Sequence, residues 1–124
     1  MNKLILGLLL TCLSTVAMAD TWSVQGAGGF AFIMTKQSGK PPGPMQYAVA
    51  QTAPSPATGN AIMNMSSNHN VTFVVSNMSS WPASGQCMFN GQIKGLSATG
   101  TYICNENPGT WTWFATISPG IQKN

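Results

Sequence analysis

The chain contains no arginine and little charge of either sign. Its 124 residues include five lysines, one histidine and two acidic residues, Asp20 and Glu106. Nucleic-acid binding needs clustered basic side chains that neutralise phosphates. The four lysines that follow residue 20 are scattered and form no such cluster along the sequence. We therefore expect no nucleic-acid partner.

The scarcity of acids and histidine also argues against catalysis. Paired carboxylates for glycoside hydrolysis would require Asp20 and Glu106, and a Ser-His-acid triad would require His69 with one of those two acids. His69 lies within a run of turn-forming residues. The chain also lacks a Gly-rich phosphate loop, an H-E-x-x-H motif and a C-x-x-C motif. We expect no catalytic residues, no enzyme activity and no cofactor.

Long hydrophobic runs are absent after the first thirteen residues, so no later segment has the length of a membrane-spanning helix. The one long run, Leu4 to Leu13, follows Lys3, and small residues recur at Ala17 and Ala19. A positive charge, about ten apolar residues and an A-x-A site are typical of a cleavable secretory signal. We expect cleavage between Ala19 and Asp20.

Removal of the signal peptide, residues 1–19, leaves residues 20–124, a length typical of one small domain. We expect this domain to be secreted or periplasmic, with no integral membrane segment. It keeps four lysines against two acids, a formal charge of +2. Cys12 leaves with the signal, so Cys87 and Cys104 remain. An even pair of cysteines in an exported domain indicates a disulfide.

Helical periodicity is absent after the signal, whereas strand patterns recur about every ten residues. The expected strands cover 21–26, 29–36, 46–52, 60–66, 71–77, 86–94, 97–105 and 110–118. Short connections favour antiparallel neighbours. We therefore predict an all-β fold, a small antiparallel meander of about eight short strands that forms either a barrel or a two-sheet sandwich.

The segment between the two cysteines predicts its own register. Gly95-Leu96 suits a two-residue type II′ hairpin turn, and a turn centred there pairs Phe89 with Tyr102 and Cys87 with Cys104. The cysteines then form a non-hydrogen-bonded pair, in which side chains approach most closely. That position matches the short Cβ separation of a disulfide. We predict a structural disulfide that closes one hairpin.

The last expected strand alternates clearly between apolar and polar side chains. One face carries Trp111, Trp113, Ala115 and Ile117, separated by Thr residues and by Phe114. We interpret this face as directed toward the core. The alternative interpretation is that the two tryptophans form an aromatic platform for a sugar or another ligand.

An up-and-down meander brings alternate connections to the same end of the molecule. The connections expected to share one end are 53–59, 78–85 and 105–109. This end carries Trp81, either tucked under a barrel mouth or exposed, together with Pro82 and Glu106. Loops on a rigid scaffold commonly carry binding, and an exposed Trp is a common hot spot. We name these three residues as candidate partner-binding residues.

The preferred functional hypothesis is an exported, noncatalytic protein that binds a protein or glycan partner outside the cytoplasm. Inhibitors and host-interaction factors often have this kind of architecture, and their inclusion here is an analogy at the level of architecture. A structural or surface-associated component is an alternative, favoured by the neutral surface rich in Gly, Ser and Thr.

A periplasmic soft-metal carrier is a further alternative. Met63 and Met65 share one face of an expected strand, and His69 follows in the next turn; thioether and imidazole ligands suit Cu(I). Trp81-Pro82-Ala83 resembles small periplasmic β-barrel copper chaperones, in which a Trp caps a Met/His site, and the resemblance implies copper binding. Ser84-Gly85 stand where that family carries Met-x-Met. Core packing explains the methionines equally well, since Met fills gaps.

Overall fold

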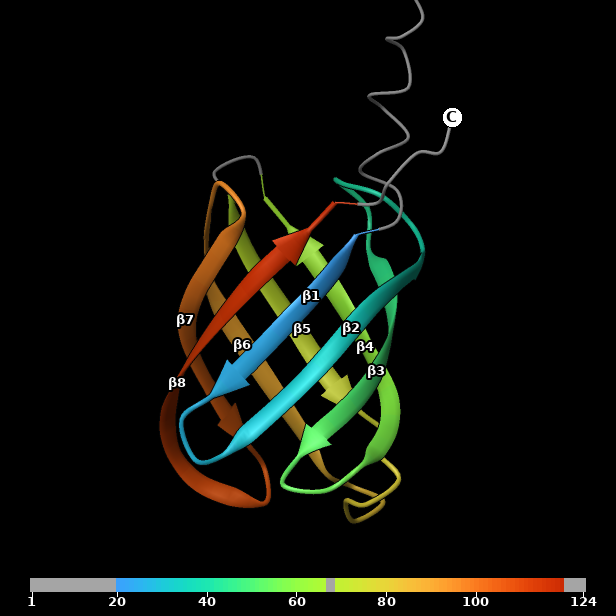
Figure 1. The fold of residues 1–124 in the computed structure, drawn as a ribbon, viewed down its shortest axis with the longest axis vertical. Helices are drawn as coiled ribbons and strands as arrows, with labels where there is room; N and C mark the ends of the chain where they lie inside the picture. The colour runs from blue at the N-terminus through green and yellow to red at the C-terminus, as the bar shows by residue number, and fades with distance from the viewer. Residues whose placement is uncertain (1–19, 67–68, 120–124) are drawn as a thin grey trace, which may run out of the picture.

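The computed structural model describes residues 20–66 and 69–119. Eight strands follow one another in this part of the chain, with the bounds Thr21–Gly26 (β1), Phe30–Ser38 (β2), Met45–Ala53 (β3), Ala57–Met65 (β4), Asn70–Ser76 (β5), Gln86–Lys94 (β6), Ser97–Cys104 (β7) and Asn107–Ser118 (β8). Each strand is antiparallel to the next, and β1 also pairs with β8 (Figure 1). The predicted antiparallel meander is confirmed, and it closes as a barrel instead of a sandwich.

The expected signal peptide lies outside the described residues, and its cleavage stays a prediction. In the part of the chain that the structure describes, no helix has the length and hydropathy that a membrane crossing requires.

The period-2 pattern of the strands separates the inside of the barrel from the outside. In β3, Met45, Tyr47, Val49 and Gln51 are buried, whereas the residues between them are exposed. β4 and β6 show the same alternation over most of their length. Because successive side chains of a strand point to opposite faces, apolar residues at every second position specify a barrel wall with one buried face.

Aromatic rings fill the middle of the barrel. Phe89 stacks on Phe73 with the ring centroids 4.6 Å apart, and on Tyr102 with the centroids 4.7 Å apart. Trp113 packs edge-on against Phe73 at 5.3 Å, and its indole N–H donates to the carbonyl oxygen of Asn90 at 3.1 Å. The interior is therefore a packed core, as in other small eight-stranded barrels.

The predicted register of the cysteine hairpin is confirmed. β6 and β7 pair Cys87 with Cys104 and Phe89 with Tyr102. The two cysteines form a disulfide, and their Cα atoms are 4.0 Å apart, as expected for a non-hydrogen-bonded pair. Gly95 has a φ of 62°, which the first central position of a type II′ turn requires.

The connection between β7 and β8 differs from the expected 105–109 loop. The turn consists of Asn105 and Glu106 alone. Pro108 and Gly109 belong to an irregular part of β8, in which residues 108–110 lie opposite a single residue of β7. Gly109 adopts a φ of 119° there, a conformation that favours glycine. The residues that suggested a loop therefore form a bulge within the strand pair.

Candidate functional site

The two ends of the barrel carry different connections. The Trp81 end is formed by residues 27–29, 54–56, 77–85 and 105–106, and the lysine end by the connections that follow β2, β4 and β6. The predicted grouping of three loops at one end is confirmed, and the β1–β2 turn joins them. Figure 1 shows these four connections together at its lower edge.

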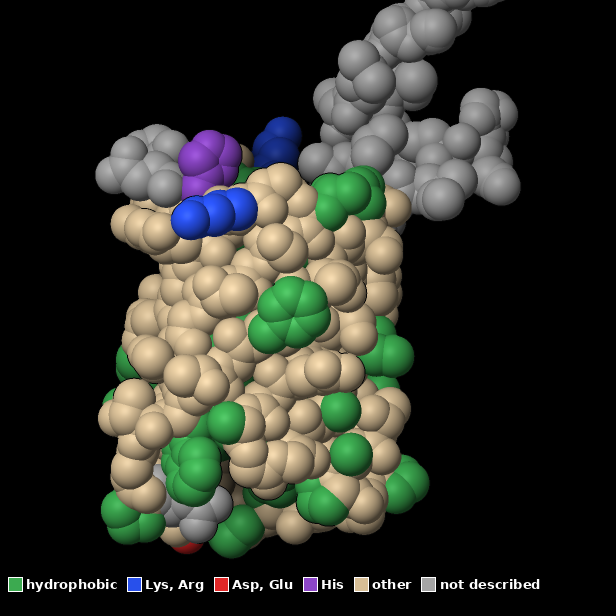
Figure 2. All heavy atoms as spheres, turned by 60° about the vertical axis from the view of Figure 1, so that its left-hand side comes forward, with side chains coloured by type: hydrophobic (Ala, Val, Ile, Leu, Met, Phe, Trp, Pro, Cys, Tyr) green, Lys and Arg blue, Asp and Glu red, His purple; other side chains and the backbone are tan. Residues whose placement is uncertain are grey.

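Charged side chains are segregated between the two ends. All described lysines belong to the lysine end, together with His69 and Asp20. Glu106 lies in the β7–β8 turn and is, among the described residues, the only charged side chain at the Trp81 end. Figure 2 shows Lys and His atoms at one end, acidic atoms at the other, and hydrophobic atoms mainly on the half nearer the acidic end.

The 77–85 loop is held firmly over the Trp81 end. Met78 is buried and occupies the space beside Gly59, where an added Cβ would meet the Met78 sulfur. The Ser79 N–H donates to the Thr58 carbonyl oxygen at 2.8 Å, and the Ser79 hydroxyl accepts from the Thr58 N–H at 3.1 Å. The Trp81 N–H closes a turn onto the Met78 carbonyl at 3.0 Å. The position of Trp81 therefore depends on contacts to β4.

A chain of aromatic rings leads from Trp81 into the core. Trp81 is half-buried, and its ring lies 5.7 Å from that of Phe30, which in turn lies 5.9 Å from that of Tyr102. The Tyr102 hydroxyl donates to the Ala27 carbonyl oxygen at 2.9 Å, and burial raises the pKa of Tyr102 above its ordinary value. Trp81 is thus neither fully tucked away nor fully exposed.

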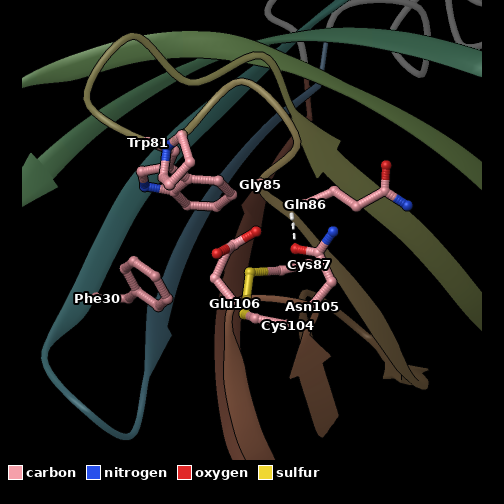
Figure 3. Close-up of a pocket in the computed structure, with 9 residues that line it drawn as sticks. Phe30, Trp81, Gly85, Gln86, Cys87, Cys104, Asn105 and Glu106 are labelled. Carbon is pink, nitrogen blue, oxygen red and sulfur yellow. Dashed lines mark hydrogen bonds between the residues drawn. A yellow bond between two sulfur atoms is a disulfide. The ribbon is translucent and has the colours of Figure 1, made fainter.

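The β7–β8 turn is tied to the 77–85 loop. The Asn105 side chain accepts from the Gln86 N–H at 2.9 Å and donates to the Ser84 carbonyl oxygen at 2.6 Å. Glu106 Oε2 accepts from the Ser84 hydroxyl at 3.1 Å. The Cys87–Cys104 disulfide joins the strands that lead into these segments (Figure 3). The turn, the loop and the disulfide therefore form one connected unit.

Two hollows open at the Trp81 end. The Trp81 hollow has a volume of about 110 Å³, and its lining includes Phe30, Trp81, Pro82, Cys87, Cys104 and Glu106 (Figure 3). The Trp111 hollow has a volume of about 360 Å³ and is lined by Gly28, Phe30, Pro54, Tyr102, Cys104 and Trp111. Because they share Phe30 and Cys104, we describe the two hollows together as the aromatic mouth.

Comparisons of this chain with known protein families, with curated proteins and with solved structures found no match.

The structure brings the three candidate partner-binding residues together, because Trp81, Pro82 and Glu106 all line the Trp81 hollow. Sequence reasoning missed Phe30, which lies between the two hollows. The signal for it was available, since the alternation of connections that places three loops at this end also places the 27–29 turn there. Tyr102 was expected only as the cross-strand partner of Phe89, and it also forms part of the mouth.

The prediction that Trp111 faces the core is wrong, although it holds for Trp113. Trp113 is 3% exposed and Trp111 is 38% exposed. Both lie on the same side of β8, but Trp111 is next to the bulge at the rim of the barrel. Its ring lies against Gly28 and Gly109, where an added Cβ would be 3.7 Å and 3.6 Å from the indole. At this rim position the Trp111 ring is partly open to solvent and lines a hollow.

The candidate copper ligands lie toward the lysine end. Met63 is fully buried in the core, and Met65 is half-buried against it. His69 is exposed with a φ of 64°, and its N–H donates to the Ser66 carbonyl oxygen at 3.1 Å. Among the described residues, no three His, Cys, Asp or Glu side chains are grouped so that they could hold a metal ion.

Proposed function

We propose that this chain is an exported, noncatalytic binding protein that engages a protein or glycan partner through the aromatic mouth. The observation that carries the proposal is the partial exposure of Trp81, Phe30 and Trp111 around two adjacent hollows. Exposed aromatic side chains near rigid loops are frequent anchors of binding energy. The barrel presents these rings on a scaffold that is packed from the rim to the core.

A noncatalytic role is supported by the separation of the ionisable groups. Glu106 lies at the Trp81 end, whereas Asp20 and His69 lie at the lysine end. A pair of carboxylates separated by a few ångströms, as hydrolysis of a glycosidic bond requires, is therefore not formed by these two acids. Asp20 is also engaged otherwise, since its Oδ1 accepts a 2.8 Å hydrogen bond from the Tyr47 hydroxyl.

An extracytoplasmic location, secreted or periplasmic, is supported by two features. The disulfide between Cys87 and Cys104 is of a kind that persists in oxidising compartments and is rare in the cytosol. The first nineteen residues have the pattern of a secretory signal. Mass spectrometry of the exported protein tests both features, since we expect Asp20 as the first residue and a mass two hydrogens below the reduced form.

Affinity capture tests the binding role. Wild type, Trp81→Ala and Trp111→Ala are immobilised and exposed to extracytoplasmic material and to a panel of glycans. We expect the recovery of a partner to fall in both variants, because each substitution removes an aromatic surface from one hollow. Near-UV circular dichroism of each variant checks that the core is intact.

Phe114→Ala serves as the matched control. Phe114 is also an exposed aromatic residue of β8, but it lies on the outer wall and lines neither hollow of the mouth. Its removal is expected to leave recovery unchanged. Equal recovery by wild type, Trp81→Ala and Trp111→Ala would exclude the mouth as the binding site.

A further inference from the structure

We propose that the Trp81 hollow receives one positively charged side chain, the guanidinium or ammonium group of an Arg or Lys residue on a partner protein. This inference rests on the proposed function and specifies the chemistry of the partner. It is drawn from four properties of the hollow: its charge, its aromatic lining, its size and its position relative to the lysines.

The charge of the hollow comes from a single carboxylate. Glu106 lines the hollow, and Figure 3 shows its carboxylate directed toward the indole of Trp81. Oε2 accepts from the Ser84 hydroxyl at 3.1 Å, which restrains the group, while Oε1 accepts no hydrogen bond from any described residue. The nearby amide of Asn105 already bonds to Gln86 and Ser84. Glu106 is therefore the charged group of the hollow with an oxygen that remains available to a ligand.

The aromatic lining complements a cation. The rings of Trp81 and Phe30 both line the hollow, with centroids 5.7 Å apart and planes tilted by 39°. A cation within about 6 Å of an aromatic face is attracted by the ring quadrupole, most strongly for Trp. The apolar stem of Arg or Lys gains at the same time from contact with rings and with the disulfide. A carboxylate next to an aromatic face thus matches both parts of a basic side chain.

The size of the hollow favours the end of a side chain over a whole ligand. Pockets for complete small molecules are usually about 300–1,000 Å³, whereas this hollow measures about 110 Å³. It opens beside the larger Trp111 hollow, which is available to apolar neighbours of the same partner residue. A protruding group of a larger molecule therefore fits the arrangement.

The distribution of charge between the two ends favours the approach of a basic partner to the Trp81 end. The lysines that the structure describes all belong to the opposite end. A basic partner is repelled from that end and attracted to the end that carries Glu106, so the barrel is oriented before contact. The hydroxyls of a neutral glycan donate hydrogen bonds to a carboxylate but gain no charge–charge attraction from it, and this difference separates the two partner classes.

A titration with matched peptides tests the proposal. The ¹⁵N-labelled protein is titrated with blocked Ala-Arg-Ala, with blocked Ala-citrulline-Ala, in which the side chain is isosteric but neutral, and with neutral cellotriose. We expect the Arg peptide to shift the Trp81 indole resonance and the amides of residues 84–87 and 105–106. The citrulline peptide is expected to bind more weakly by roughly threefold or more, the order of an exposed charge interaction.

Variants assign the effect to named groups. Glu106→Gln keeps the shape of the side chain and is expected to remove the preference for Arg over citrulline. Trp81→Ala is expected to weaken the binding of both peptides. Lys94→Gln, at the lysine end, and Phe114→Ala are controls that should change neither the Arg preference nor the affinity for the peptides. The Arg preference should shrink when salt is raised from about 0.01 M to about 1 M, because the Debye length falls from about 30 Å to about 3 Å.

Equal binding of the Arg and citrulline peptides, or an unchanged Arg preference in Glu106→Gln, would overturn the cation proposal. Binding of cellotriose that depends on Trp81 but not on Glu106 would also overturn it, while leaving the mouth as a binding site. Failure of the proposed function is a different result: partner recovery would then be insensitive to both Trp81→Ala and Trp111→Ala.

Discussion

The two ends of this barrel are closed in different ways. Near the lysine end the inward residues Met45, Tyr47 and Met63 are almost completely buried, and the half-buried inward residues Met65, Ile93 and Ile117 carry no aromatic ring. At the Trp81 end the inward rings reach the surface, since Phe30 and Trp81 are half-buried and Trp111 is exposed. The two ends share the same strands, so the difference arises from the connections and from the residues next to them.

The comparison indicates that the two ends of this small domain have different roles. The lysine end, here called the sealed end, contributes buried apolar surface, which stabilises the fold. The Trp81 end, here called the open end, leaves apolar rings in contact with water, a feature that marks interaction surfaces in soluble proteins. The smaller burial at the open end is offset by covalent and hydrogen-bonded restraints, namely the disulfide and the contacts of Asn105. Three predictions test whether the ends are as different as this comparison implies.

The largest effect is expected from removing the disulfide. In the Cys87→Ala/Cys104→Ala variant the free energy of unfolding should fall by about 3 kcal/mol, because a short loop is no longer closed in the unfolded chain. Urea denaturation measures the loss. Hydrogen exchange should accelerate more strongly in residues 84–88 and 103–106 than around Gly95, since local opening begins where the restraint is lost. Equal acceleration at both ends would contradict the comparison.

A smaller loss is expected when a methyl group is added to a glycine at the open end. In Gly26→Ala the new Cβ would lie 2.9 Å from the ring of Tyr102, which is buried and hydrogen-bonded to Ala27. Overpacking of this kind costs about 1–3 kcal/mol. The matched control, Gly43→Ala at the lysine end, places its Cβ 3.4 Å from the Lys40 carbonyl oxygen and should change the melting temperature little. Similar melting temperatures for both variants would contradict the assigned contact.

The smallest effect concerns the two tyrosines at alkaline pH. Burial and the Asp20 carboxylate raise the pKa of Tyr47, and burial raises the pKa of Tyr102. A tyrosine that stays protonated in the folded state but ionises at about pH 10 in the unfolded state lowers stability above that pH, by up to about 1.4 kcal/mol per pH unit. We expect the free energy of unfolding to be insensitive to these groups below about pH 9 and to fall above about pH 10.

Single variants separate the contributions of the two tyrosines. Tyr47→Phe should remove more of the alkaline decline than Tyr102→Phe, because Tyr47 is the more strongly perturbed group at the sealed end. Urea unfolding at several pH values, together with tyrosinate absorbance of the folded protein, measures this. An alkaline slope that is unchanged in Tyr47→Phe would show that this hydroxyl ionises in the folded state as it does in the unfolded chain.

Much of the fold could be predicted from local pattern, whereas the mouth could be predicted only in part. All eight expected strands are present, with bounds that differ by at most three residues. The loop positions followed from alternation of connections. Trp111 could not be placed, because its exposure depends on the bulge at Pro108 and Gly109, and turn-forming residues in sequence do not distinguish a loop from a bulge.

The sequence by itself determined the strands, the pairing of Cys87 with Cys104 and the inward position of Trp113, because these depend on a two-residue period and on one turn. Only the tertiary structure decided that β1 meets β8 and that Phe30 meets Trp81. These contacts join residues far apart in the chain, and local pattern carries no information about which distant partner covers an exposed face. The open mouth is therefore a product of both levels: alternation of the connections places four turns at one end, and closure of the barrel brings Phe30 next to Trp81.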